Sequence, residues 1–280
     1  MEEKIDESCL LLVLEGGEDM GFVEIEGLKI HYHSVGDPGD KKGQRVMYIH
    51  GTGSNTRVWE NHMEALADSH TPVAMDLPGH GQSEGLGFRG AADYAHFVVK
   101  LAESLGWDRF VVAGHSLGGA IALTATVYNM DMINGLMLID TGARLRVHPG
   151  ILKAALEAAQ TGKPAPLDRS WAYANSTPQS VVDDMQNKTD DSDLWVTYRD
   201  WICDDSFDFT TRLKNIDVPT LAVCGEKDKL TPLRYHQFFK EKMPRCQLAV
   251  IKNAGHWTYV EQPEEFNRII KEFLDRLPAL

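Results

Sequence analysis

A serine at a sharp turn is the most chemically suggestive residue of the sequence. The apolar run 110–113 is suited to a buried strand, and the apolar run 117–128 is suited to a buried helix. Ser116 lies between them without a linker, in a Gly-x-Ser-x-Gly pattern formed with Gly114 and Gly118. Glycines there allow two backbones to approach closely and allow strained dihedral angles. Such a turn exposes a hydroxyl at a helix N-terminus, where developing negative charge is stabilised, as nucleophilic attack on a carbonyl requires.

The segments around Ser116 predict a mostly parallel sheet with helices on both faces. Continuously apolar stretches are typical of strands covered on both faces, and they recur at 46–49, 73–75, 110–113, 136–139, 220–224 and 248–251. Helical periods lie between them, most clearly at 94–105 and at 266–277, with Pro263 at the expected start of the last helix. This alternation predicts an α/β architecture with right-handed crossovers.

Two regions depart from the alternation. Residues 22–26 and 28–33 alternate apolar with polar side chains about Gly27, which predicts an antiparallel hairpin at the edge of the sheet. From 142 to 213 there is no convincing strand, although both flanks return to the strand pattern. Helix-sized segments occur there at 151–160, 178–187 and 194–203. We therefore expect an acidic N-terminal leader (1–20), a core formed by 21–141 and 214–280, and an inserted helical cap (142–213).

In these features the chain resembles the α/β-hydrolase family, over roughly residues 22–277 and with the insertion at the position of the family's cap. Serine-dependent members carry an acid and then a histidine later in the chain. The matching motifs are Gly225-Glu-Lys-Asp and Asn253-Ala-Gly-His, each directly after a predicted strand. The resemblance implies that His256 takes a proton from Ser116. It also implies that Asp228 orients the imidazole and stabilises its cation.

Two other acids compete with Asp228 for this role. Glu226 lies two residues earlier, and Asp140 lies at the end of the predicted strand 136–139, where we expect it to brace a loop.

The resemblance also implies an oxyanion hole made by two backbone N–H groups. Leu117, the residue after the nucleophile, would supply one of them. The other should come from the loop His50-Gly-Thr-Gly, where Thr52 is the first choice and Gly53 the second. We expect His50, and His80 in another family-like loop, to brace loops rather than to take part in catalysis.

A serine nucleophile favours acyl transfer, because dehalogenases and epoxide hydrolases of this family attack with aspartate. We expect a serine hydrolase, a carboxylesterase that works through an acyl-enzyme. The cap holds three of the six tryptophans, and its aromatic residues form either a substrate pocket or the cap's own core. The candidate substrate-binding residues are Trp171, Tyr198, Trp201 and Trp257.

The charge of the cap favours small neutral esters of short to medium chain length. Residues 148–213 contain 11 acidic and 6 basic side chains, most of them expected on the surface, so strongly anionic substrates gain little attraction. Lactone hydrolysis and cleavage of a C–C bond in ring-fission products are alternatives that use the same triad. Their substrates carry carboxylates, so a pocket arginine (Arg169, Arg199 or Arg212) would favour them. A ligand receptor of the same fold, with negligible turnover, is a more remote alternative.

Composition excludes several other classes of protein. The chain has 280 residues, 43% of them hydrophobic, as in folded domains. A net charge of −13 without any basic run argues against nucleic-acid binding. The four cysteines show neither paired nor metal-binding spacing, which favours a reducing compartment.

Membrane partners and cofactors are not expected either. No apolar run is long enough to span a membrane, and the short run 9–14 has an acidic flank, unlike a signal peptide. We therefore expect a cytoplasmic protein that acts on a small molecule. We expect no cofactor and no metal, because His31 and His33 are better explained as one face of the hairpin. The sequence leaves the oligomeric state open.

Overall fold

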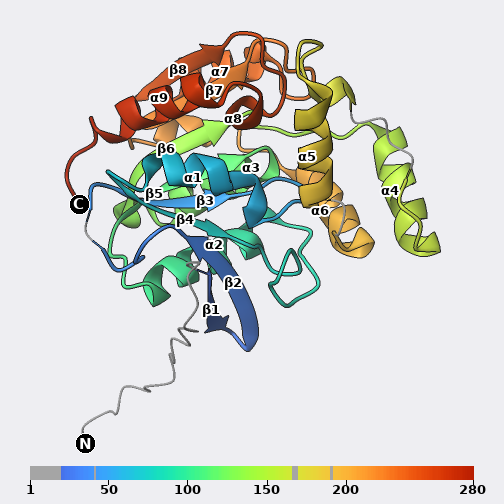
Figure 1. The fold of residues 1–280 in the computed structure, drawn as a ribbon, viewed down its shortest axis with the longest axis horizontal. Helices are drawn as coiled ribbons and strands as arrows, with labels where there is room; N and C mark the ends of the chain where they lie inside the picture. Colours follow the sequence, from blue (N-terminus) through green and yellow to red (C-terminus); the bar gives the residue numbers. More distant parts are fainter. Residues whose placement is uncertain (1–19, 41, 166–169, 190–191) are drawn as a thin grey trace, which may run out of the picture.

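The computed structural model describes residues 20–40, 42–165, 170–189 and 192–280. Within these residues eight strands form one sheet, in the order β1-β2-β4-β3-β5-β6-β7-β8 (Figure 1). The strands are β1 (Met20–Ile25), β2 (Leu28–Ser34), β3 (Arg45–Ile49), β4 (Thr71–Met75), β5 (Phe110–His115), β6 (Ile133–Ile139), β7 (Thr220–Gly225) and β8 (Cys246–Ile251). Each apolar run of the sequence lies in one of them, as predicted.

The antiparallel hairpin predicted at the sheet edge is confirmed. Among the described residues β1 pairs only with β2, and β2 pairs antiparallel with β4, whereas all pairs from β4 to β8 are parallel. The hairpin turns at Glu26 and Gly27, both with positive φ. Residues 1–19 of the expected leader lie outside the described residues, and Met20 already belongs to β1.

Helices cover both faces of the sheet because its inner strands are apolar on both sides. Val112 of β5 packs with Phe97 and Ile121 on one face, and Val111 packs with Met63 and Phe266 on the other. The first face is covered by α2 (Ala91–Ser104), α3 (Leu117–Tyr128) and α7 (Leu233–Lys242), and the second by α1 (Glu60–Leu66), α8 (Thr258–Glu261) and α9 (Pro263–Leu274). This two-faced core makes the α/β-hydrolase architecture. None of the described helices is long and apolar enough to cross a membrane.

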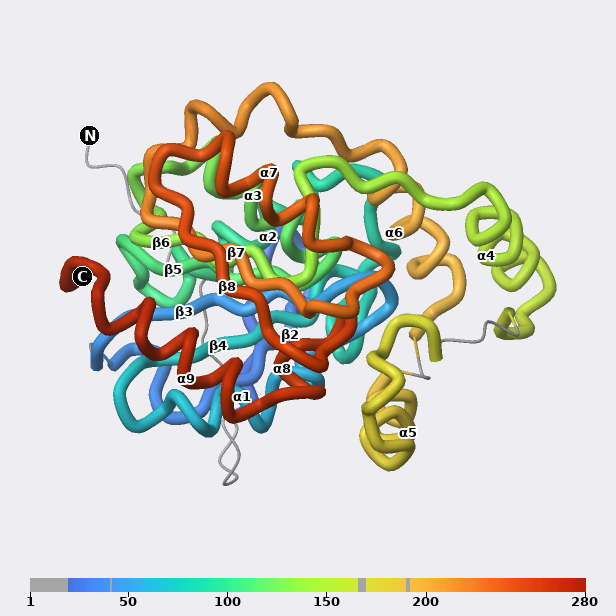
Figure 2. The backbone as a smooth tube through the Cα atoms, turned by 90° about the horizontal axis from the view of Figure 1, so that it is seen from above, coloured from blue at the N-terminus to red at the C-terminus, as the bar shows by residue number. Residues whose placement is uncertain are grey.

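The helices predicted for the insertion are α4 (Pro149–Thr161), α5 (Gln179–Thr189) and α6 (Leu194–Ser206). They gather at one end of the molecule, on the right in Figures 1 and 2. The two ends of the insertion meet, since Phe209 N–H donates to Ala143 O over 2.7 Å and Arg144 bridges to Asp208. This closed stem supports the proposed division into a core and a cap with limits at 142 and 213.

Candidate active site

Ser116 occupies a strained turn between β5 and α3. Its φ of 54° and ψ of −120° lie in a region that residues other than glycine rarely adopt. Neighbouring groups stabilise this backbone: Ser116 N–H donates to Ile139 O over 3.1 Å, and Thr141 Oγ1 donates to Ser116 O over 2.7 Å. Ser116 is partly exposed although His115 and Leu117 are fully buried. At this turn Ser116 is therefore accessible, whereas its two neighbours in the chain are not.

Close backbone contacts explain the two glycines around Ser116. A Cβ on Gly114 would lie 2.0 Å from Gly118 O, and a Cβ on Gly118 would lie 2.3 Å from Ile49 O. The start of α3 thus packs directly on the ends of β5 and β3, as expected from the Gly-x-Ser-x-Gly pattern.

Asp228 and His256 are brought together by the loops after β7 and β8. Their Oδ2 and Nδ1 atoms are 2.9 Å apart. The other carboxylate oxygen, Oδ1, accepts hydrogen bonds from the N–H groups of Leu230 and Thr231, and Thr231 Oγ1 donates to Oδ2. Because Oδ2 is an acceptor, Nδ1 of His256 must carry a proton, which leaves Nε2 of the neutral imidazole free to accept one.

The charges of the pair stabilise one another. Burial raises the pKa of Asp228, but the charge and hydrogen bond of His256 and the donors from Thr231 outweigh burial and hold this pKa below its usual value. Burial lowers the pKa of His256, but the charge and hydrogen bond of Asp228 raise it more, so the pKa lies above 6.5. Asp228 is therefore ionised and His256 titrates as a base.

His115 connects the serine turn to the histidine loop. Its Nε2 donates to His256 O over 2.8 Å, and burial lowers the pKa of this imidazole well below its usual value, so it is neutral. Strands β5, β7 and β8 are parallel, so Ser116, Asp228 and His256 all follow strand ends at the same edge of the sheet. The structure thus brings the three sequence-predicted residues to one edge; their catalytic roles remain a proposal.

The loop after β3 runs beside the serine. A Cβ on Gly51 would lie 3.1 Å from Ser116 Cβ, so this backbone is in contact with the Ser116 turn. The N–H of Gly53, the second choice for the oxyanion hole, donates to Asp200 over 2.9 Å and is therefore already engaged. This leaves Thr52 as the candidate donor in this loop, together with Leu117 at the start of α3.

His50 braces loops, as expected. Its Nδ1 donates to Gly51 O over 2.9 Å, and its Nε2 accepts from Leu77 N–H over 3.2 Å. The imidazole thereby joins the loop after β3 to the loop after β4.

Neither competing acid takes the place of Asp228. Glu226 is exposed and pairs with Lys227. Asp140 is fully buried; its Oδ1 accepts from Gly225 N–H, and its Oδ2 accepts from both N–H and Oγ1 of Thr258. Asp140 therefore braces the two loops that carry Asp228 and His256, the role expected for it.

Possible metal ligands also meet here. Oxygen atoms of Asp140 and Asp228 and the sulfur of Cys224 lie within 4.8 Å of one another. The carboxylates, however, accept the hydrogen bonds described above, which already satisfy them. The donor set is therefore better explained as loop bracing than as a metal site.

Glu261, a residue that the sequence reasoning missed, holds both sides of His256. Its Oε1 accepts from the N–H groups of Gly255 and Trp257, and its Oε2 accepts from Ala174 N–H in the cap. His256 N–H itself donates to Ala172 O of the cap over 2.7 Å. The cap therefore helps to fix the histidine loop. No local sequence pattern singles out Glu261, because three of its partners are backbone N–H groups and the fourth, the hydroxyl of Thr177, is far away in the sequence.

Two acidic residues of the cap were also missed. Most cap acids were expected on the surface, and Asp200 and Asp204 are exceptions, because 0% and 4% of their area is exposed. They lie with Val196 and Cys203 on the buried face of α6. The signal in the sequence was their spacing, since acids one turn apart interrupt an otherwise apolar stripe.

The four aromatic candidates for substrate binding differ in their surroundings. The ring of Trp257 lies 4.6 Å from that of His115 and 6.1 Å from that of His256. Trp171 is partly buried and packs against the core cluster on the sheet face that α1, α8 and α9 cover. Tyr198 and Trp201 are partly buried and lie off the α6 face that carries Asp200. Trp257 is thus placed beside the histidine, while a role in substrate binding stays a prediction for all four.

The cap arginines have other partners. Arg199 donates to Leu86 O, and Arg212 donates to the exposed Tyr128 and stacks over Phe209. Arg169 lies outside the described residues.

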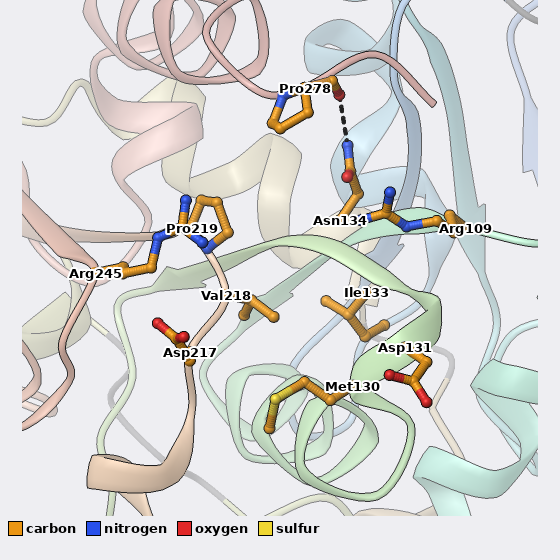
Figure 3. Close-up of a pocket in the computed structure, with 10 residues that line it drawn as sticks. All are labelled: Arg109, Met130, Asp131, Ile133, Asn134, Asp217, Val218, Pro219, Arg245 and Pro278. Atoms are coloured by element: carbon orange, nitrogen blue, oxygen red, sulfur yellow. Dashed lines mark hydrogen bonds between the residues drawn. The ribbon is translucent and has the colours of Figure 1, made fainter.

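A separate cavity of about 280 Å³ lies at the other end of the strands. Figure 3 shows Arg109, Asn134 and Arg245 around it, with Asn134 donating to Pro278 O. Arg109 immediately precedes β5, whereas Ser116 immediately follows it, so this cavity is on the edge opposite the candidate site.

Comparisons with known proteins agree with this architecture. The model of the "Alpha/beta hydrolase family" matches residues 46–269. A solved thermophilic esterase is 33% identical, with a TM-score of 0.77 over 92% of this chain and 98% of that one. The enol-lactonase from Burkholderia xenovorans LB400 is 18% identical, with a TM-score of 0.83 over 90% of this chain and 99% of that one, a likeness of fold.

A curated relative supports the same assignment. The 2-hydroxy-6-oxo-6-(2'-aminophenyl)hexa-2,4-dienoic acid hydrolase of Metapseudomonas resinovorans is 26% identical, over 91% of this chain and 90% of that protein. The matched family model includes the serine turn, the loop after β3 and both loops that carry Asp228 and His256. The chain belongs to the α/β-hydrolase family.

Proposed function

We propose that this hydrolase cleaves carboxylic esters through an acyl-enzyme, with Ser116 as nucleophile, His256 as base and Asp228 as the orienting acid. One observation carries the proposal. A strained serine is joined through His115 to a histidine whose Nδ1 is held by a buried carboxylate, which leaves Nε2 as the base.

The reaction follows from these atoms. Nε2 of His256 takes the Ser116 hydroxyl proton as Oγ attacks the ester carbonyl carbon, and Asp228 stabilises the imidazolium. The N–H groups of Thr52 and Leu117 bind the oxyanion of the tetrahedral intermediate. The imidazolium then protonates the leaving alcohol. Water, deprotonated by His256, hydrolyses the acyl-enzyme by the same steps in the second half of the reaction.

Neutral esters of short to medium chain length fit the cap best. Arg199 and Arg212 are engaged by Leu86 and by Tyr128, so neither supports binding of a substrate carboxylate. The acids Asp200 and Asp204 lie against the loop after β3, so this part of the cap supplies no positive charge to an anionic substrate. The 33% identical thermophilic esterase supports ester hydrolysis.

Hydrolysis of lactones or of C–C bonds in ring-fission products is the second candidate. It is favoured by the likeness to an enol-lactonase and to the hexadienoic acid hydrolase. A receptor that does not turn over its ligand is the remaining alternative. We further propose a cytoplasmic location, which the three unpaired, buried cysteines of the described residues support.

Hydrolysis of p-nitrophenyl esters from acetate to dodecanoate tests the proposal. We expect fast turnover that peaks at short or medium chains and is lost in Ser116→Ala. Ser104→Ala is the matched control, because this hydroxyl only donates to Lys100 O on α2. Turnover of carboxylate-bearing lactones or ring-fission products with none of the esters would favour the second candidate. Turnover of none of these substrates would favour the receptor.

A further inference from the structure

Helix α6 of the cap holds the loop after β3 at two adjacent points. Thr52 Oγ1 donates to Asp204 Oδ2 over 2.7 Å, and Gly53 N–H donates to Asp200 Oδ2 over 2.9 Å. The two acids are one helical turn apart and share the buried face of α6. A helix of the cap therefore fixes both the side chain of the candidate oxyanion donor and the peptide that follows it.

Asp200 anchors this helix to the core. Besides Gly53, it accepts from His80 Nε2 over 2.8 Å and from Tyr94 Oη over 2.7 Å. His80 is in the loop after β4 and Tyr94 is on α2, so one carboxylate ties three core elements to α6. Burial lowers the pKa of His80, but the charge and hydrogen bond of Asp200 raise it more, so this pKa is above its usual value.

Asp204 has one oxygen without a partner. Its Oδ1 is buried and has no hydrogen-bond partner among the described residues, whereas Oδ2 accepts from Thr52. Burial raises the pKa of this carboxyl to about 8, with a further rise from Asp200, while the hydroxyl of Thr52 and the charge of His256 act against it. At neutral pH the acid is therefore mostly uncharged.

The other groups that act on Asp204 do not supply a positive partner. On α6 itself Asp200 and Asp205 are acidic, and burial and Asp204 raise the pKa of the Cys203 thiol. From the core, Thr52 is uncharged, and His256 is positive only when it is protonated, whereas it must be neutral to act as the base. A negative charge on Asp204 would therefore have no positive partner, and it would lie next to Thr52 in the loop after β3.

We propose that Asp200 and Asp204 are positioning residues of the oxyanion hole: they hold the Thr52 peptide toward Ser116, and Asp204 supports catalysis only in its neutral form. The inference rests on the proposed function. Oxyanion donors act only when held close to the ideal geometry, and an adjacent negative charge opposes the charge that develops on the oxyanion. The cap of this enzyme is thus part of its catalytic apparatus as well as a cover.

The test compares Asp204→Ala, Asp204→Asn and Thr52→Val with wild type by kcat and KM of a p-nitrophenyl ester from pH 6 to pH 10. Active sites are counted with a serine-directed phosphonate, so misfolded protein does not affect kcat. We expect Asp204→Ala and Thr52→Val to lower kcat at least about tenfold with little change in KM, because the backbone donor stays but is less well held. Asp205→Asn is the control, since its Oδ1 can still accept from Val147 N–H.

The pH profile separates catalytic positioning from a structural role. The wild-type kcat should fall above about pH 8 as Asp204 ionises. Asp204→Asn should recover part of the activity lost in Asp204→Ala and should lack this alkaline fall. An unchanged alkaline fall in Asp204→Asn, or a wild-type kcat in Asp204→Ala, would overturn the inference. If the phosphonate does not label Ser116, or if Ser116→Ala stays active, the proposed function itself fails.

Discussion

The substitution Asp228→Asn should inactivate the enzyme through the tautomer of His256. The carboxylate oxygen Oδ1 accepts from the N–H groups of Leu230 and Thr231, while Oδ2 faces His256 Nδ1. An asparagine must therefore place its oxygen at the Oδ1 position. Its NH₂ group then faces Nδ1 and forces the imidazole to accept there, which puts the proton on Nε2 and removes the base.

Magnitudes favour this orientation over the reverse. Turning the amide would point its NH₂ group at two backbone donors and leave both unsatisfied, at about 1–3 kcal/mol each. We expect kcat to fall roughly 10⁴-fold, as in other triads with this change, which is a loss of about 5 kcal/mol of transition-state stabilisation. The fold should persist, because both loop hydrogen bonds remain.

Initial rates with a p-nitrophenyl ester, together with melting temperatures, check this prediction. Glu226→Gln is the matched control, because this acid is exposed and two residues away. A loss of less than tenfold in Asp228→Asn, with the fold intact, would refute the assignment of Asp228 as the orienting acid.

Three further perturbations follow from the same contacts. Gly118→Ala places a Cβ 2.3 Å from Ile49 O, so we expect about 1–3 kcal/mol of destabilisation by chemical denaturation; Gly90→Ala, whose Cβ meets only Asp93 at 3.4 Å, should change little. The acid limb of kcat/KM should have its midpoint above pH 6.5, because His256 must be neutral and Asp228 raises its pKa; a midpoint below pH 6 would contradict this. The pKa of Asp204 is about 8 in the folded protein and 3.8 in the unfolded chain, so the folded state binds this proton more tightly. The free energy of unfolding therefore falls as the pH rises from about 4 to about 8. At pH 7, Asp204→Asn should therefore increase the free energy of unfolding by up to about 4 kcal/mol and raise the melting temperature relative to wild type. At pH 4 it should change neither. An equal effect at both pH values would contradict the ionisation of Asp204 between them.

The core, and the placement of Ser116, Asp228 and His256 at one edge of the sheet, could be predicted because local patterns encode them. Buried parallel strands are continuously apolar, and the Ser116 turn needs glycines at fixed offsets, so both are visible in one segment of sequence. Asp228 and His256 follow strand ends, and the parallel topology brings those ends to one edge.

The contacts between cap and core could not be predicted in this way. Asp200 and Asp204 resemble surface acids until α6 is docked, because their partners come from the loop after β3, the loop after β4 and α2. The same docking engages the Gly53 N–H, which favours Thr52 over Gly53 as the proposed oxyanion donor. Glu261 bonds to backbone groups near His256 and in the cap, which no pattern of side chains records.

Mass mapping after reaction with a serine-directed phosphonate tests the central claim most directly. The account predicts a single adduct, on Ser116, that forms quickly in the wild type. Because His256 must deprotonate the nucleophile, the adduct should form far more slowly in His256→Ala and should be absent in Ser116→Ala. An adduct on another residue, or equal labelling of the wild type and His256→Ala, would contradict the account.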